Sequence, residues 1–201
     1  MVIITFWLIL IIVALVFLPP FFINWLIPET DKLFYEEYRK KLNPWVWWMF
    51  PAKSWVYAII WTIMYGLITA AIVTYAISYE DQIVPPVTIA DIIPSRDYLA
   101  IMSLLFINHI FNLLWSFFFF VKRWVWMCMI DSILLFGTGF AALILMGLDR
   151  EWTPFGLYFA YVIWSFYAMI LSVIWASMLY PVYIEHRKAK RTVVVERYSD
   201  Q

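Results

Sequence analysis

Long apolar runs alternate with shorter polar connections along the whole 201-residue chain. Each run exceeds the roughly 20 helical residues that span a bilayer. The runs cover about residues 2–28, 54–79, 98–121, 124–148 and 154–184. The pattern therefore predicts an all-α membrane protein. We expect a bundle of five transmembrane helices in one domain over residues 1–184, followed by a basic tail over residues 185–201.

Composition agrees with this pattern, since 65% of the residues are hydrophobic, far above the usual share in a soluble domain. Lysine and arginine lie mainly on one side of the predicted membrane. Five are in the 29–53 connection, two are Lys122 and Arg123, and five follow from Arg187, whereas the other side holds only Arg96 and Arg150. Because positive residues favour the cytosolic side, the first loop and the C-terminus are predicted to be cytosolic.

A polar pair is predicted inside the hairpin of the third and fourth runs. Lys122 and Arg123 interrupt the apolar sequence as a turn would, and Asn112 and Asp131 lie at similar separations on either side of it. Equal separations on antiparallel helices place both side chains at a similar depth. They either form an interhelical hydrogen bond that only joins the helices, or line a pocket together with nearby aromatic residues.

Several kinds of chemistry find no support in the sequence. The single Cys128 excludes an intrachain disulfide, and His109 and His186 are too far apart to indicate a metal site. No phosphate-binding loop or series of ionisable residues suggests active pumping. We therefore predict no cofactor, no metal and no catalytic residue. The aromatic 29–53 loop has two possible roles, an interfacial belt or a lid over a ligand site.

Aromatic and polar residues recur in a characteristic order over four of the predicted helical segments. In chain order they are Trp55, Trp61, Tyr65, Asn112, Trp115, Phe119, Phe120, Arg123, Asp131, Tyr161, Trp164, Phe166 and Ala168. This order and spacing resemble the translocator protein family, also called tryptophan-rich sensory proteins and peripheral-type benzodiazepine receptor-like proteins. The chain resembles a divergent member, since Phe117 stands where that family has a proline.

The resemblance implies five transmembrane helices, homodimerisation and a pocket beneath the first loop that binds sterols, such as cholesterol, or porphyrins. The ligand-binding residues implied by the matched positions are Trp61, Tyr65, Asn112, Trp115, Trp164 and Ala168. Trp61 and Trp164 also match tryptophans that the family uses in porphyrin photochemistry. In a eukaryote, the resemblance implies the mitochondrial outer membrane.

Three functions follow as alternatives. The leading one is a multi-pass membrane protein, a receptor or passive transporter, that binds a hydrophobic small molecule of the sterol or tetrapyrrole class for sensing, sequestration or passive transport. The second is a light-dependent enzyme that degrades porphyrin, which leaves enzymatic activity open. The third is a structural scaffold whose pocket is vestigial. In each case the expected partners are membrane lipid and, in the first two, the small molecule, with no nucleic acid.

Overall fold

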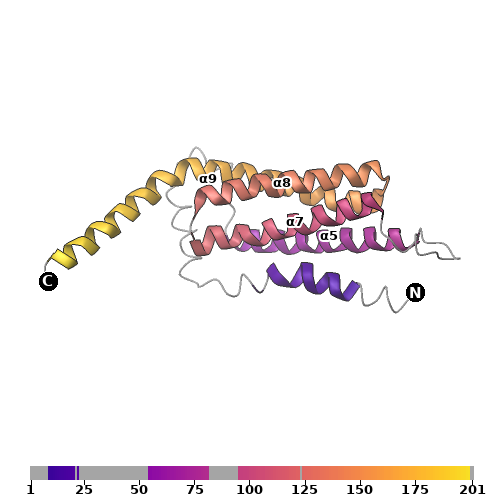
Figure 1. Ribbon diagram of the computed structural model, residues 1–201, viewed down its shortest axis with the longest axis horizontal. Helices are drawn as coiled ribbons and strands as arrows, with labels where there is room; N and C mark the ends of the chain where they lie inside the picture. Colours follow the sequence, from indigo (N-terminus) through magenta and orange to yellow (C-terminus); the bar gives the residue numbers. More distant parts are fainter. Residues whose placement is uncertain (1–8, 21, 23–53, 82–94, 123, 200–201) are drawn as a thin grey trace.

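The computed structural model describes residues 9–20, 22, 54–81, 95–122 and 124–199. Every regular element among them is helical (Figure 1). Four helices are long and apolar enough to cross a membrane, and the helix Ile9–Pro20 is a shorter apolar one. The elements are the π-helical turn η1 (Val13–Phe17) within that short helix, α5 (Ser54–Asp81), α7 (Arg96–Ser116), the π-helical turn η2 (Phe117–Lys122), α8 (Val125–Leu148) and α9 (Trp152–Ser199).

The all-helical class is as predicted. Of the first predicted run, 2–28, the structure describes only the part that contains η1 and Phe22, and the 29–53 loop lies outside the described residues. The helix α9 continues without a break through position 185 to Ser199, so the predicted tail begins inside a helix. Its apolar span covers Trp152–Ser177, and the rest extends past the bundle (Figure 1).

Local sequence explains how α7 begins and how α8 ends. The Ser95 hydroxyl accepts a hydrogen bond from the Tyr98 backbone N–H at 3.1 Å, which caps the first turn of α7. At the end of α8, Arg150 has a φ of 62°, and the Glu151 N–H donates to the Met146 carbonyl at 3.0 Å. This left-handed termination reverses the chain within a few residues, which sets α9 antiparallel to α8.

The hairpin between α7 and α8 contains a wider helical turn than the sequence predicts. The backbone adopts π-helical geometry from Phe117 to Lys122, and the Trp124 N–H donates to the Phe118 carbonyl at 2.9 Å. Trp124 then leaves the helical conformation, with φ −90° and ψ 80°, before α8 begins. A π-helical turn holds more residues than an α-helical one, so η2 changes the face that the following residues present.

The long helices form a bundle in which α9 packs between α5 and α8, while α7 packs on α8 (Figure 1). The helix that contains η1 lies against α5. Between α5 and α7, by contrast, close approaches are few. Side chains rather than adjacent backbones therefore connect these two helices across the interior.

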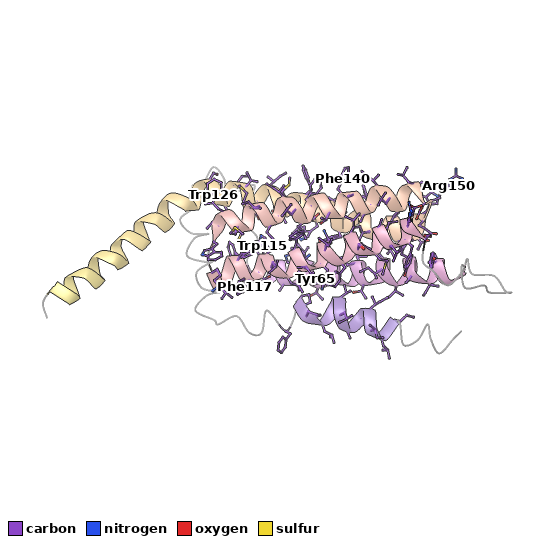
Figure 2. The ribbon with its side chains drawn as sticks, in the orientation of Figure 1. Tyr65, Trp115, Phe117, Trp126, Phe140 and Arg150 are labelled. Atoms are coloured by element: carbon purple, nitrogen blue, oxygen red, sulfur yellow. The ribbon has the colours of Figure 1, made fainter. Side chains whose placement is uncertain are left out.

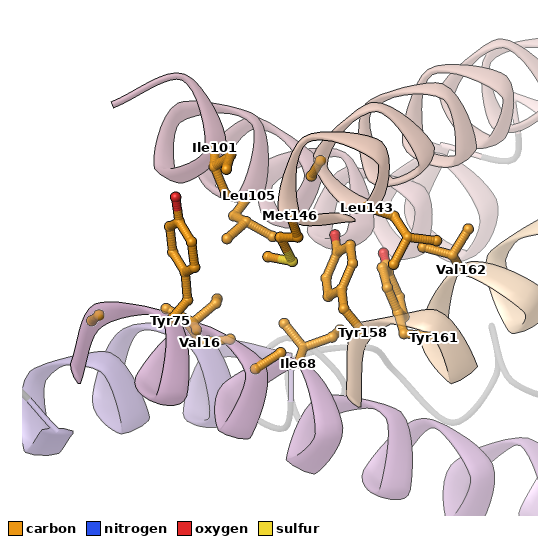
Figure 3. Close-up of a cluster of buried hydrophobic side chains, with 14 of the residues drawn as sticks. Val16, Ile68, Tyr75, Ile101, Leu105, Leu143, Met146, Tyr158, Tyr161 and Val162 are labelled. Atoms are coloured by element: carbon orange, nitrogen blue, oxygen red, sulfur yellow. The ribbon is translucent and has the colours of Figure 1, made fainter. Parts of the chain in front are cut away.

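The buried apolar side chains fall into two clusters. The first lies toward the α8–α9 turn and includes Ile68, Met146 and Tyr158 (Figure 3). The second lies toward the α7–α8 hairpin and includes Phe119 and Trp175. Large apolar side chains also cover the outer surface of the bundle; Phe140, for example, points away from it (Figure 2). Such an outer surface suits contact with lipid.

Candidate functional site

A network of hydrogen bonds around Asn108 occupies the centre of the bundle. The Asn108 carboxamide oxygen accepts from the hydroxyls of Tyr158 at 3.1 Å and Tyr161 at 2.8 Å. Its nitrogen donates to the Leu135 carbonyl at 2.5 Å and to the Thr138 hydroxyl at 3.0 Å. Asn108 is thus hydrogen-bonded to both α8 and α9, and its position in the interior satisfies both ends of the amide.

Gly139 gives the Asn108 side chain the space that this network requires. A methyl group built at Gly139 would lie 3.1 Å from the Asn108 amide nitrogen and 3.6 Å from the Tyr158 hydroxyl. A side chain at position 139 would therefore push against the amide. Small residues at helix contacts permit such close approach within membrane bundles.

Asn112 extends the same network to α5. Its carboxamide oxygen accepts from the Tyr65 hydroxyl at 2.6 Å, and its nitrogen donates to the Tyr161 hydroxyl at 3.1 Å. Because α5 and α7 approach each other at few positions, the hydrogen bond between Tyr65 and Asn112 is a direct side-chain link across the interior. Through Asn108 and Asn112 together, the network joins all four long helices.

An aromatic group adjoins this link between α5 and α9. The rings of Trp61 and Tyr65 are stacked, with centroids 5.6 Å apart. The ring of Trp164 meets Trp61 edge-on, with centroids 6.1 Å apart and an angle of 83° between the planes. Ala168 lies one helical turn beyond Trp164 on α9 and is partly buried. The structure thus brings Trp61, Tyr65, Asn112 and Trp164 together, with Ala168 one turn away.

Trp115, the sixth predicted ligand-binding residue, contributes to a second group nearer the hairpin. Its ring stacks on Phe119 with centroids 4.9 Å apart, and its indole N–H donates to the Ser172 hydroxyl at 3.2 Å. The Ser172 and Ser132 hydroxyls are 2.8 Å apart, and Ser132 donates to the Cys128 carbonyl at 2.7 Å. This chain of donors connects α7, α9 and α8.

Asp131 is buried, with 3% of its surface exposed, but it does not pair with Asn112 as the sequence suggested. Both hydrogen bonds found for the Asn112 amide go to tyrosines. Within the described part of the chain, the Asp131 Oδ2 atom has no hydrogen-bond partner. Tyr65 and Tyr161 reach Asn112 from α5 and α9 and occupy one acceptor and one donor position of its amide.

The depth of Asn112 and Asp131 nevertheless follows the antiparallel geometry. Asn108 contacts Leu135 across the α7–α8 interface, and Asn112 lies one turn closer to the hairpin. Asp131 lies one turn before Leu135, on the same side of α8. Antiparallel packing therefore brings Asn112 and Asp131 to a similar level.

The predicted site omitted Asn108, Tyr158 and the serine pair. Two signals in the sequence could have found Asn108 and Tyr158. Asn108 and Asn112, four residues apart, share one helix face, and Tyr158 and Tyr161, three residues apart, share another. Two amides facing two tyrosines form a natural set of donors and acceptors. Among the described residues, no group of three histidine, cysteine, aspartate or glutamate side chains could hold a metal ion.

Helices with apolar outer surfaces and a polar, hydrogen-bonded interior define the class of this protein, an integral membrane protein. A family model agrees with this class in more detail. The TspO/MBR family model matches residues 8–176, most of the chain, and the protein belongs to the TspO/MBR family. This finding confirms the resemblance seen in the sequence. No curated protein and no solved structure matches the chain.

Proposed function

We propose that this TspO/MBR family protein binds a flat hydrophobic small molecule of the sterol or tetrapyrrole class, for sensing, sequestration or passive transport. The observation that carries the proposal is the aromatic group of Trp61, Tyr65 and Trp164, which adjoins the amide of Asn112. Binding sites for small molecules combine large apolar surfaces with a few directed polar groups. This group has both within one region of the bundle.

The arrangement of the helices supports entry of a ligand beside this group. Because α5 and α7 approach at few positions, a ligand between them displaces side chains and leaves the backbone contacts of α8 and α9 intact. The stack of Trp61 on Tyr65 presents aromatic faces that suit a flat ring system. Tyr65 belongs both to this stack and to the hydrogen bond with Asn112, so it couples the aromatic group to the network.

The organisation of the protein in the membrane is part of the same proposal. We propose from the apolar sequence of the run 2–28 that a fifth helix crosses the membrane, and the short apolar helix Ile9–Pro20 belongs to this run. The unequal distribution of lysine and arginine supports a cytosolic first loop and C-terminus. Homodimerisation and an outer mitochondrial location in a eukaryote follow from family membership and stay predictions.

Affinity measurements on tryptophan variants test the proposal. Trp61→Leu and Trp164→Leu are each expected to weaken binding of a porphyrin and of a sterol about 5-fold to 150-fold, because each removes an aromatic contact with the ligand worth roughly 1–3 kcal/mol. Trp126→Leu is the matched control, since Trp126 lies on α8 with 45% of its surface exposed. If all three variants bind both ligands as the parent does, the aromatic group serves packing only.

A second candidate function is light-dependent degradation of a bound porphyrin. The observation that favours it is the edge contact between Trp61 and Trp164, which places two oxidisable rings beside the proposed ligand. Illumination of the protein–porphyrin complex discriminates the two functions. A binding protein leaves the porphyrin spectrum unchanged, whereas an enzyme consumes it over many turnovers and loses that activity in Trp61→Phe or Trp164→Phe.

A further inference from the structure

The buried carboxyl group of Asp131 differs from the amides of Asn108 and Asn112, which are hydrogen-bonded to tyrosines. Its Oδ2 atom makes no hydrogen bond within the described residues, although only 3% of the residue is exposed. Two donors close to it are already used. Ser132, its neighbour on α8, donates to the Cys128 carbonyl, and Tyr161 donates to Asn108.

An unsatisfied carboxyl oxygen is costly in this position. A buried acceptor without a partner forfeits the hydrogen bonds that it would form in water. Ionisable groups within membrane spans are rare and commonly belong to substrate or ligand sites. A partner from outside the chain removes the cost, because a ligand can bring a donor that the protein does not supply.

The location of Asp131 connects it with the proposed ligand site. Asp131 lies at a similar level to Asn112, as the contact between Asn108 and Leu135 establishes, and Asn112 bonds Tyr65 of the aromatic group. Ser132, the residue after Asp131, joins the chain of hydroxyls that ends at Trp115. Asp131 is therefore at the level of Asn112 and next in sequence to Ser132, and each of these residues belongs to a group that contains predicted ligand-binding residues.

We propose that the Asp131 carboxyl group binds the hydroxyl group of a hydrophobic ligand and so fixes the orientation of that ligand in the bundle. The inference rests on the proposed function and adds the chemistry of the polar end of the ligand. The neighbouring side chains Cys128, Ser132 and Tyr161 are uncharged and bear a thiol or a hydroxyl. An uncharged hydroxyl therefore suits the site better than a cation, which would have to leave water.

A matched pair of ligands tests the inference with the full-length protein in one detergent. The pair is a 3β-hydroxysterol and its 3-methyl ether, which lacks the hydroxyl hydrogen. The parent protein is expected to bind the hydroxysterol about 10-fold to 150-fold more tightly, the range of one hydrogen bond to a charged or strongly polar group. Asp131→Leu should lose this preference, because the substitution weakens binding of the hydroxysterol and leaves binding of the methyl ether unchanged.

Two further variants separate the possible causes. Asp131→Asn keeps an acceptor oxygen and nearly the same shape, so it should retain part of the preference for the hydroxysterol. It also tests the inference if Asp131→Leu does not fold. Trp164→Leu should weaken binding of both sterols by the same factor, because it removes an aromatic contact that both ligands make and leaves the contact with the hydroxyl intact.

Four results would overturn the inference. If the parent binds both sterols equally, the hydroxyl is not recognised, while the proposed function stands. If the parent prefers the hydroxysterol and Asp131→Leu keeps that preference in full, another residue recognises it. If the parent binds neither sterol, the proposed function fails for this ligand class and the inference fails with it. A long-chain amine that binds only through Asp131 would show recognition of a cation instead, which also contradicts the inference.

Discussion

Asn112 and Asp131 are buried at a similar level on neighbouring helices, yet their surroundings differ. The Asn112 amide both accepts and donates a hydrogen bond, with tyrosines of α5 and α9. Asp131 keeps a buried oxygen without a partner in the described residues. Burial alone therefore does not separate structural from binding groups in this bundle. The hydrogen-bonded amide of Asn112 joins helices, whereas the carboxyl oxygen of Asp131 is available to a ligand.

The largest effect on stability is expected at Asn108, the most connected residue of the satisfied region. Asn108→Leu removes four hydrogen bonds and leaves the Tyr158 and Tyr161 hydroxyls without that acceptor. The free energy of unfolding in detergent should fall by about 2–4 kcal/mol. Thr62→Val is the control, because among the described residues the Thr62 hydroxyl bonds only the Ala58 carbonyl of its own helix. Equal stability of the two variants would contradict a structural role for the network.

A smaller effect is expected for the link between α5 and α7. In a double-mutant cycle, Tyr65→Phe and Asn112→Leu should show a coupling of about 1 kcal/mol in unfolding free energy, because they remove one shared hydrogen bond. The parallel cycle of Asn112→Leu with Asp131→Leu should be nearly additive. Strong coupling in the second cycle and none in the first would restore the direct pair that the sequence suggested.

The sequence predicted the depth of the polar residues but not their partners. Counting residues on either side of Lys122 and Arg123 sufficed to bring Asn112 and Asp131 to one level, since antiparallel helices rise equally. The choice of partner depends on how far the tyrosines of α5 and α9 reach across the interior. Neither apolar periodicity nor spacing within one helix carries that information.

Two further features show the same limit. The order of matched aromatic residues was enough to nominate Trp61 and Trp164, and the structure brings their rings into edge contact. The α8–α9 reversal, however, has Arg150 at a φ of 62°, where a glycine is the usual residue. No signal in the local sequence distinguishes this arginine, because tertiary packing of the two helices imposes its conformation.

The smallest effect on stability is expected at Asp131. In the unliganded protein, Asp131→Leu should leave the free energy of unfolding unchanged or raise it by up to about 1 kcal/mol, because it replaces an unsatisfied buried group with an apolar one. Unfolding in the same detergent as the Asn108 variant gives the comparison. A loss as large as that of Asn108→Leu would mean that the carboxyl group stabilises the bundle.

The most direct test of ligand binding inside the bundle is to map where a photoreactive sterol attaches. After illumination of the protein with a diazirine-bearing sterol, mass spectrometry of the peptides identifies the labelled residues. The account predicts labels on α5 at Trp61–Tyr65 and on α9 at Trp164–Ala168, suppressed by an excess of the unmodified sterol. Labels confined to outward-facing residues such as Phe106 and Phe140, and unaffected by competitor, would contradict it.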